Sequence, residues 1–253
     1  MLDSILMAFS LYSRIPVPQA QWKEENMRWC ICFLPLVGAV IGALQAAAFF
    51  VMTKLACGVL LRTSILTALP ALLSGGIHLD GFLDTCDAIH SYKGREDRLA
   101  ILKDPHAGAF AIICGIVYFV LLFGVWSEAR PENILPLCCI FALSRSLSAW
   151  SALTFPKAKK DGMLRQETDP AAKGAPAAMA VVSVLAGAAV IVASPARGTA
   201  AVLAAVLTIL YYRRMSDRVF GGVTGDLSGW FTQMCELVSA GAVVLCGLLF
   251  QLQ

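Results

Sequence analysis

Charged side chains are scarce in this sequence: 15% of its 253 residues are Asp, Glu, Lys or Arg, whereas 58% are hydrophobic. A soluble core of this length could not bury so much apolar surface, so the composition excludes an ordinary soluble protein. The net charge of +3 gives no indication of a nucleic-acid partner. The sequence therefore predicts an integral membrane protein whose surroundings are the lipid bilayer.

Two further features are missing. The nine cysteines form no CxxC pair and no metal-ligand spacing, which disfavours a cysteine metal site and is typical of small buried hydrophobic residues. The first residues have neither a basic segment before Arg14 nor a small-residue cleavage site, so no cleavable signal peptide is expected. This start is expected to be an amphipathic helix on the inner membrane surface, or else to be poorly ordered.

Long apolar runs predict an all-α, polytopic bundle of about six or seven transmembrane helices in a single domain, 1–253. Most runs approach the roughly 20 residues that a bilayer crossing requires. The shortest run ends at Arg213, so this span should either continue further or cross only in part. The runs lie at 29–52, 59–76, 109–127, 134–155, 177–195, 199–212 and 229–250.

The basic residues predict the orientation of these helices. With the N-terminus inside and loops alternating, fifteen of the twenty Lys and Arg residues lie inside, four lie outside and Arg145 lies within a span. This bias follows the positive-inside rule. Most acidic residues and all three histidines also fall inside, which predicts an active site at the cytoplasmic face. A transporter is disfavoured, because proton-driven transporters concentrate ionisable residues at mid-membrane.

The stretch 75–87, GGIHLDGFLDTCD, carries the strongest chemical signal. Its aspartates Asp80, Asp84 and Asp87, spaced by four and three residues, would share one face of a helix. Crowded carboxylates suit Mg²⁺ or Mn²⁺, which commonly bridges acids to the phosphates of a substrate. A solvated acidic helix face is the alternative, but such a face normally interleaves Lys or Arg at i+4, and this stretch contains neither.

A second stretch, GGVTGD at 221–226, repeats the spacing of two glycines, three residues and an aspartate. Each stretch follows a span expected to run from outside to inside, so the two could form matching half-sites. The paired glycines would let backbone N–H groups approach a phosphate, and Asp226 would join the three aspartates as a metal ligand. Because the pattern is short, coincidence is the alternative, and Asp226 would then be a helix cap.

These motifs resemble those of the cobalamin synthase family. The resemblance runs from about Phe9 to Glu236. Ala88 replaces a glycine that is frequent in the family, and residues 162–164 differ from its usual Gly-Leu-Gly, but neither difference removes a carboxylate. The matching stretches are SRIPVP, GGIHLDGFLDTCDAIHS, ILKDPHAGAF and GGVTGDLSGWFTQMCE.

The resemblance implies an adenosylcobinamide-GDP ribazoletransferase in the cytoplasmic membrane of a prokaryote. Such an enzyme transfers the adenosylcobinamide phosphate moiety of adenosylcobinamide-GDP to the ribose 3′-hydroxyl of α-ribazole or its 5′-phosphate. It releases GMP, requires Mg²⁺ and could associate with other cobalamin-assembly enzymes. A lipid-forming CDP-alcohol phosphotransferase is the alternative enzyme class, but its D-x-x-D-G-x-x-A-R order is absent.

Residue roles follow from these patterns. One of the four aspartates is expected to accept the hydroxyl proton. His78 is expected to orient a phosphate or a carboxylate, or to be structural. Arg145 needs a partner inside the membrane, and Glu236 is the most economical one.

The remaining candidates are predicted to contact substrate. Asp104 has an alternative role as the N-cap before Pro105 of the third long helix. The inner-loop basic residues, which include Lys157 and Lys159, are either phosphate ligands or topology determinants. The candidates are Gly75, Gly76, Lys103, Asp104, Arg145, Lys160, Arg165, Gly221, Gly222 and Thr224.

Overall fold

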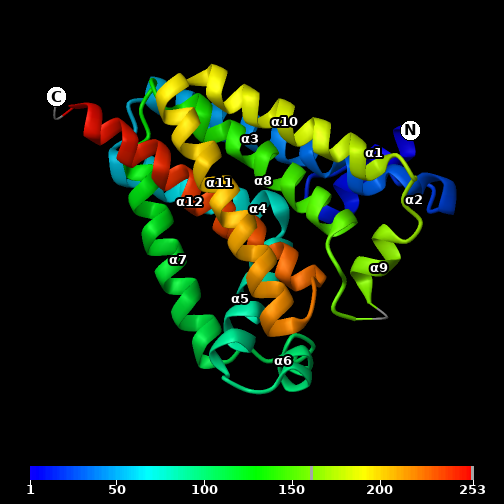
Figure 1. Ribbon diagram of the computed structural model, residues 1–253. Coiled ribbons are helices and arrows are strands. Elements are labelled where there is room, and N and C mark those ends of the chain that lie inside the picture. The colour runs from blue at the N-terminus through cyan, green and yellow to red at the C-terminus, as the bar shows by residue number, and fades with distance from the viewer. Residues whose placement is uncertain (160–161, 252–253) are drawn as a thin grey trace.

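The computed structural model describes residues 1–159 and 162–251, and the described chain is a bundle of helices (Figure 1). Six helices are long and apolar enough to cross a membrane, and a bent pair would make a seventh, which confirms the predicted all-α architecture. The α-helices are α1 (Leu2–Tyr12), α2 (Glu24–Cys30), α3 (Leu34–Lys54), α4 (Val59–Ser74), α5 (Ile77–His90), α6 (Arg95–Ile101), α7 (Ala109–Ser127), α8 (Ile134–Thr154), α9 (Met163–Thr168), α10 (Ala175–Ala193), α11 (Pro195–Met215) and α12 (Gly225–Gln251).

Each predicted apolar run is helical over most of its length, although 29–52 begins in α2 and 59–76 ends in the bend after α4. The run that ends before Arg213 belongs to α11, which begins at Pro195 and passes into a π-helical turn, η2 (Ser216–Phe220). Arg213 and Asp217 form an ion pair of 2.8 Å across this continuation. The sixth span therefore continues through its polar end, as the first of the two expectations stated.

The N-terminal residues form an ordered helix, so the expectation of a poorly ordered start was wrong. Met7 and Ala8 of α1 are fully buried, and α1 packs against α2 and α3. The backbone N–H of Arg14 donates to the carbonyl of Leu73 at 2.8 Å, which joins the end of α1 to the end of α4. Its place on a membrane surface stays a prediction.

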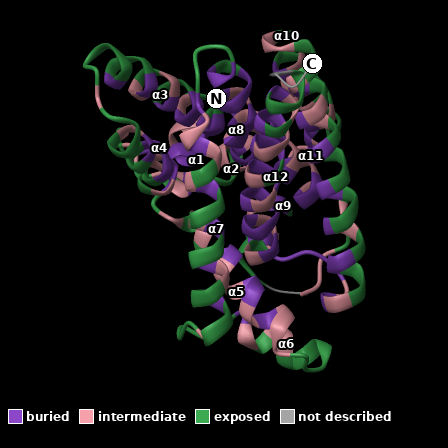
Figure 2. Ribbon diagram, turned by 90° about the vertical axis from the view of Figure 1, so that its left-hand side faces the viewer, coloured by how far each residue is buried: buried purple, intermediate pink, exposed green. Residues whose placement is uncertain are grey.

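The centre of the bundle is α8, which packs closely on α3 (Figure 2). Gly38 and Gly42, one turn apart on α3, lie directly on the carbonyl groups of Phe141 and Cys138. Side chains at these two positions would separate the helices, as at other small-residue contacts between membrane helices. By contrast, α7 is largely exposed, in keeping with a helix that faces lipid (Figure 2).

Helix α4 contains Pro70, which cannot donate a hydrogen bond to the carbonyl of Leu66. The side-chain amide of Gln45, fully buried on α3, donates to that carbonyl at 2.5 Å instead. Gln45 thus replaces the hydrogen bond that Pro70 cannot make, and it links α3 to α4.

A bend of 95° separates α4 from α5. Gly75 and Gly76 form the bend with φ of 68° and 80°, a left-handed conformation that glycine adopts without steric cost. Because of this bend, α5 turns toward α12 and carries its aspartates there.

Candidate functional site

The first turns of α5 and α12 are in backbone contact. A Cβ atom added to Gly81 would lie 2.6 Å from the carbonyl oxygen of Asp226, and one added to Gly229 would lie 2.8 Å from that of His78. Gly81 is next to Asp80 and one turn before Asp84. The two motifs are therefore neighbours in space, as the repeated glycine–aspartate spacing predicted.

The turns that precede these helices are built alike. Gly75 ends α4 and Gly221 ends η2, both in the left-handed conformation, and a second glycine of positive φ follows each. However, the space over Gly221 is taken by the Arg95 side chain, and a Cβ on Gly222 would lie 2.5 Å from the carbonyl oxygen of Pro156. Gly221 and Gly222 therefore serve close packing within the protein. Of the four glycines in the two pairs, Gly76 is the one at which an added Cβ would meet nothing within 4 Å.

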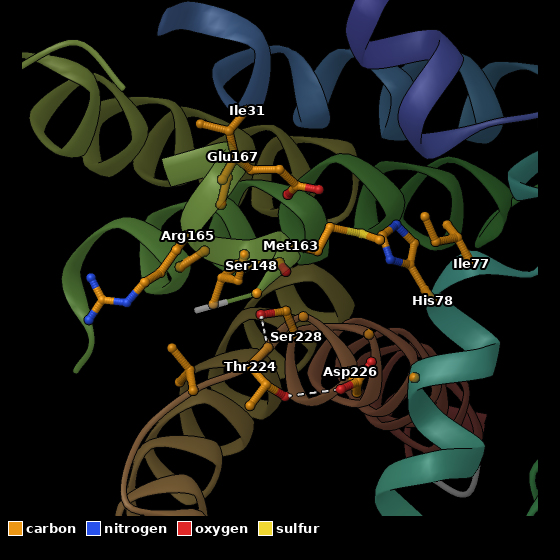
Figure 3. Close-up of a pocket in the computed structure, with 18 of the residues that line it drawn as sticks. Ile31, Ile77, His78, Ser148, Met163, Arg165, Glu167, Thr224, Asp226 and Ser228 are labelled. Carbon is orange, nitrogen blue, oxygen red and sulfur yellow. Dashed lines mark hydrogen bonds between the residues drawn. The ribbon is translucent and has the colours of Figure 1, made fainter. Parts of the chain in front are cut away.

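A cavity of about 240 Å³ lies between α1, α5, α8, α9 and the start of α12 (Figure 3). Sequence reasoning missed four of its polar residues, which come from segments far apart in the chain: Tyr12, Ser148, Glu167 and Ser228. Five of the predicted site residues line it: His78, Asp80, Arg165, Thr224 and Asp226.

The carboxylates gather at one side of this cavity. Asp80 is exposed and Asp226 is half-buried. Asp84 lies outside the cavity lining, but Asp80, Asp226, Asp87 and Asp104 are all close enough to repel its negative charge. Among the residues that the structure describes, no Lys or Arg forms an ion pair with the four aspartates of the two motifs.

The donor set limits the kind of metal that it could hold. In residues 1–159 and 162–251, no three His, Cys, Asp or Glu side chains converge to form a metal site. A closed site for a structural metal is therefore not built here. Mg²⁺, however, usually binds to one or two carboxylates and completes its coordination with substrate phosphates and waters. Two unpaired carboxylates beside a cavity fit that mode of binding.

Asp87 makes a different contact. Its two oxygens accept hydrogen bonds from the backbone N–H groups of Gly108 and Ala111, at 2.5 and 2.8 Å. These groups lie at the beginning of α7, where N–H groups have no partner within the helix. Asp87 therefore caps α7 from the neighbouring helix.

Asp104 does not cap α7, so that alternative was wrong. The helix begins at Ala109, because Asp87 supplies the acceptors that a local cap would provide. Asp104 instead accepts hydrogen bonds from the backbone N–H and the ring of His106, at 3.0 and 2.8 Å. The backbone bond, and then the side-chain bond, hold the pKa of Asp104 below its usual value.

Thr224 caps α12. Its hydroxyl oxygen accepts a hydrogen bond from the N–H of Leu227 at 3.2 Å, and its hydroxyl donates to Asp226 at 3.4 Å. Because Thr224 takes the capping role, the carboxylate of Asp226 remains available to the cavity. The alternative, in which Asp226 would be the helix cap, was wrong.

The loop after α8 brings basic groups to the same place. Two backbone hydrogen bonds join Val223 to Pro156 and Ala158, at 2.8 and 3.0 Å. They hold Lys159 near Asp226 and Lys103, and burial lowers the pKa of the Lys159 ammonium group. Arg165 donates to the carbonyl of Lys159 at 2.9 Å. Lys160 lies outside the described residues.

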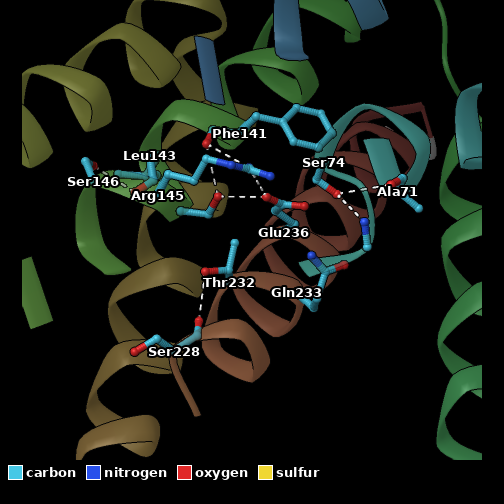
Figure 4. Close-up of polar contacts among 12 residues, drawn as sticks. Ala71, Ser74, Phe141, Leu143, Arg145, Ser146, Ser228, Thr232, Gln233 and Glu236 are labelled. Atoms are coloured by element: carbon cyan, nitrogen blue, oxygen red, sulfur yellow. Dashed lines mark hydrogen bonds and ion pairs between the residues drawn. The ribbon is translucent and has the colours of Figure 1, made fainter. Parts of the chain in front are cut away.

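Arg145 is paired with Glu236, as predicted (Figure 4). The Nη1 and Oε1 atoms are 2.5 Å apart, and Ser144 donates a further hydrogen bond to the same oxygen at 2.9 Å. Arg145 does not line the cavity, so the structure gives its predicted contact with substrate no support.

Comparisons with known proteins agree on one family. The sequence pattern of the cobalamin-5-phosphate synthases matches residues 4–244. A Lachnoclostridium phytofermentans protein named adenosylcobinamide-GDP ribazoletransferase is 42% identical over 245 residues, which cover 96% of this chain and 94% of that protein. Proteins of the same name from Geobacillus kaustophilus and Sinorhizobium medicae are each 30% identical and cover 98% and 96% of this chain, and 95% and 96% of their own lengths. No solved structure matches the chain.

Proposed function

The chain belongs to the cobalamin-5-phosphate synthase family, and from this we propose that it is an adenosylcobinamide-GDP ribazoletransferase whose reaction takes place where α5 meets α12. A ribose hydroxyl of ribazole, or of its 5′-phosphate, attacks the phosphorus of the adenosylcobinamide phosphate. The bond from this phosphorus to the GMP oxygen breaks, and GMP leaves. The product is adenosylcobalamin or its 5′-phosphate.

One contact carries the assignment of the site. The backbone of Asp226 lies against Gly81, which brings the aspartates of two separate motifs to one side of one cavity. A pyrophosphate must be neutralised before a hydroxyl can attack it, and carboxylates achieve this only through a bound cation.

Mg²⁺ is the proposed cation, with Mn²⁺ as a substitute. Asp80, Asp226 and the pyrophosphate would be its ligands. Asp84, which is close to both aspartates, would add negative charge to the site. When bound, Mg²⁺ supplies charge stabilisation to phosphoryl transfer. Asp80 or Asp226 would accept the hydroxyl proton, since both line the cavity and neither pairs with a described basic residue.

Basic groups would serve the leaving nucleotide. Lys159 lies beside Asp226, and Arg165 lines the same cavity. Their charges would stabilise the phosphate of GMP as it leaves. Lys160, also predicted to contact substrate, belongs to the same stretch of sequence as Lys159.

The site is proposed to face the cytoplasm of a prokaryotic inner membrane. The positive-inside count supports this orientation. Two loops assigned to the outside meet at one end of the bundle, where Arg197 donates to the carbonyl of Glu132 at 3.0 Å. Association with other cobalamin-assembly enzymes stays a prediction.

The test is reconstitution. Purified protein in liposomes is supplied with adenosylcobinamide-GDP, α-ribazole and Mg²⁺, and GMP and cobalamin are measured. Asp80→Asn and Asp226→Asn should each lower turnover at least 100-fold, whereas Glu128→Gln, at the other end of the bundle, should stay within twofold of wild type. Wild-type activity in both aspartate variants would contradict the site, and no cobalamin from the wild-type protein would contradict the function.

A further inference from the structure

The cavity beside Asp80 and Asp226 has an apolar interior that phosphoryl chemistry does not use. This interior is lined by Tyr12, Ile31, Leu34, Ala149, Ala152 and Met163. We propose that it binds the aromatic base of the ribazole acceptor, with the ribose directed toward the two aspartates. The proposal rests on the proposed function, and it assigns the acceptor substrate to the apolar interior of the cavity.

Two aromatic rings form one wall of this interior. The rings of Tyr12 and His78 are nearly parallel, at 16°, with their centroids 6.5 Å apart, and the two residues are 5% and 7% exposed. The Tyr12 hydroxyl donates to Glu167 of α9 at 2.9 Å, which fixes the orientation of the ring. Flat, rigidly held rings are suited to stacking against a planar base.

His78 also lacks a partner. Its ring makes no hydrogen bond to any described residue, and its Nε2 atom is buried without one. A buried polar group without a hydrogen bond carries a free-energy penalty, which a ligand can remove by bonding to the group. Figure 3 shows His78 at the cavity on the side of α5, across from Ser148 and Glu167.

The base of ribazole matches this environment. It is a planar benzimidazole with two methyl groups and one free ring nitrogen, so most of its surface is apolar and it needs few hydrogen bonds. Guanine, the other base in the reaction, carries several donors and acceptors. Ile31, Leu34 and Ala152 could not satisfy them, and of the nearby polar groups Tyr12 and Glu167 are already bonded to each other, which leaves Ser148. The guanine of the donor therefore belongs outside the interior, near the basic loop.

Size gives the same answer. The volume of about 240 Å³ is below the range of roughly 300–1,000 Å³ that is typical of sites for drug-sized ligands. A single bicyclic base can enter such a space, whereas a corrin ring cannot. The corrinoid must then approach the aspartates from outside, and the base from inside, with the reacting phosphorus between them.

The test separates the two substrates. Ala152→Leu narrows the interior and Tyr12→Leu removes an aromatic face. Each should raise the KM for α-ribazole at least tenfold and leave the KM for adenosylcobinamide-GDP within twofold. Ala47→Leu, an exposed position on α3, should change neither value. Calorimetry of α-ribazole binding without donor should show the same tenfold loss, which makes the result independent of turnover.

A smaller acceptor distinguishes a binding role from a folding defect. The benzimidazole riboside without methyl groups should have a lower KM than α-ribazole in Ala152→Leu, since it relieves the clash, and a higher KM in the wild type. If both variants raise the KM for adenosylcobinamide-GDP and leave ribazole binding unchanged, the interior holds part of the donor and the proposal is wrong, although the transferase function stands. If the wild-type protein forms no cobalamin, the function itself fails.

Discussion

Arg145 and Glu236 form an ion pair inside the bundle, 1% and 7% exposed, with Nη1 and Oε1 at 2.5 Å (Figure 4). A second acceptor, the carbonyl of Phe141, lies 3.2 Å from the same Arg145 nitrogen. Two charges at such depth are costly unless they remain together, so the pair couples α8 to α12. Neither residue lines the cavity. We therefore expect loss of the pair to lower the stability of the protein more than its catalytic rate.

The first prediction follows from this pair. Glu236→Leu leaves a buried guanidinium without a counter-charge and should lower the free energy of unfolding by about 3–5 kcal/mol. The double variant Arg145→Met with Glu236→Leu should recover most of that loss, since no charge remains unpaired. Unfolding in detergent, followed by circular dichroism, measures both. A single variant as stable as wild type would show that the pair does not couple the helices.

The second prediction concerns the contact between α5 and α12. Gly229→Ala would introduce a Cβ atom 2.8 Å from the carbonyl oxygen of His78, so the helices must separate. We expect at least a tenfold loss of turnover, because the aspartates of the two motifs move apart. Gly241→Ala on the same helix is the matched control, since a Cβ there meets nothing within 4 Å. Equal activity of the two variants would mean that this close approach is not required.

Much of this arrangement could be predicted from the sequence, because it follows from local rules. Apolar length located the spans, and the paired glycines followed by Asp80 and Asp226 indicated two matching half-sites. The Arg145–Glu236 pair followed from the cost of an isolated charge in a membrane. Each prediction needed only one segment, or one physical requirement that few residues could meet.

The cap of α7 and the pairing of Tyr12 with Glu167 depend on tertiary contacts that no local sequence pattern predicts. Asp87 caps α7 from 21 residues away. The apolar run indicated that this helix begins at 109, but the sequence could not show that Asp87, rather than Asp104, caps it. Tyr12 and Glu167 meet across 155 residues, because α1 and α9 both pack against α2. A single sequence carries no signal of such pairs.

The third prediction tests the role of Asp87. Asp87→Asn retains an oxygen that can accept the N–H of Gly108 or Ala111, whereas Asp87→Ala loses the cap at a cost of about 1 kcal/mol. If capping is its main role, Asp87→Asn should keep turnover within tenfold of wild type and Asp87→Ala should lower hydrogen-exchange protection at the start of α7. A loss in Asp87→Asn as large as that in Asp80→Asn would instead favour a metal ligand.

The fourth prediction concerns orientation. Single cysteines placed at Lys93 and Asp217, in a chain without its native cysteines, should react with a membrane-impermeant reagent only from the cytoplasmic side. Cysteines at Arg130 and Arg197 should react only from outside, since these residues belong to loops that meet at the other end of the bundle. Labelling at position 93 from outside would show that the orientation is the reverse of the one proposed. The site would then face away from the cytoplasm, where the nucleotide substrate is made.

The fifth prediction is a pH dependence that follows from Lys159. Burial lowers the pKa of its ammonium group, with Lys103 adding to the shift and Asp226 opposing it. The group is protonated below that pKa and loses its charge as the pH rises through it, at a lower pH than an exposed lysine would. If the charge binds the donor's phosphates, kcat/KM for adenosylcobinamide-GDP should fall on the alkaline side, because this ratio reports the free enzyme. Lys159→Arg should move the decline to higher pH, since a guanidinium stays protonated. Lys159→Gln should lower the ratio below that pKa and approach the wild-type value above it, where the wild-type amine is neutral as well. An alkaline decline that is identical in wild type and Lys159→Arg would assign it to another group.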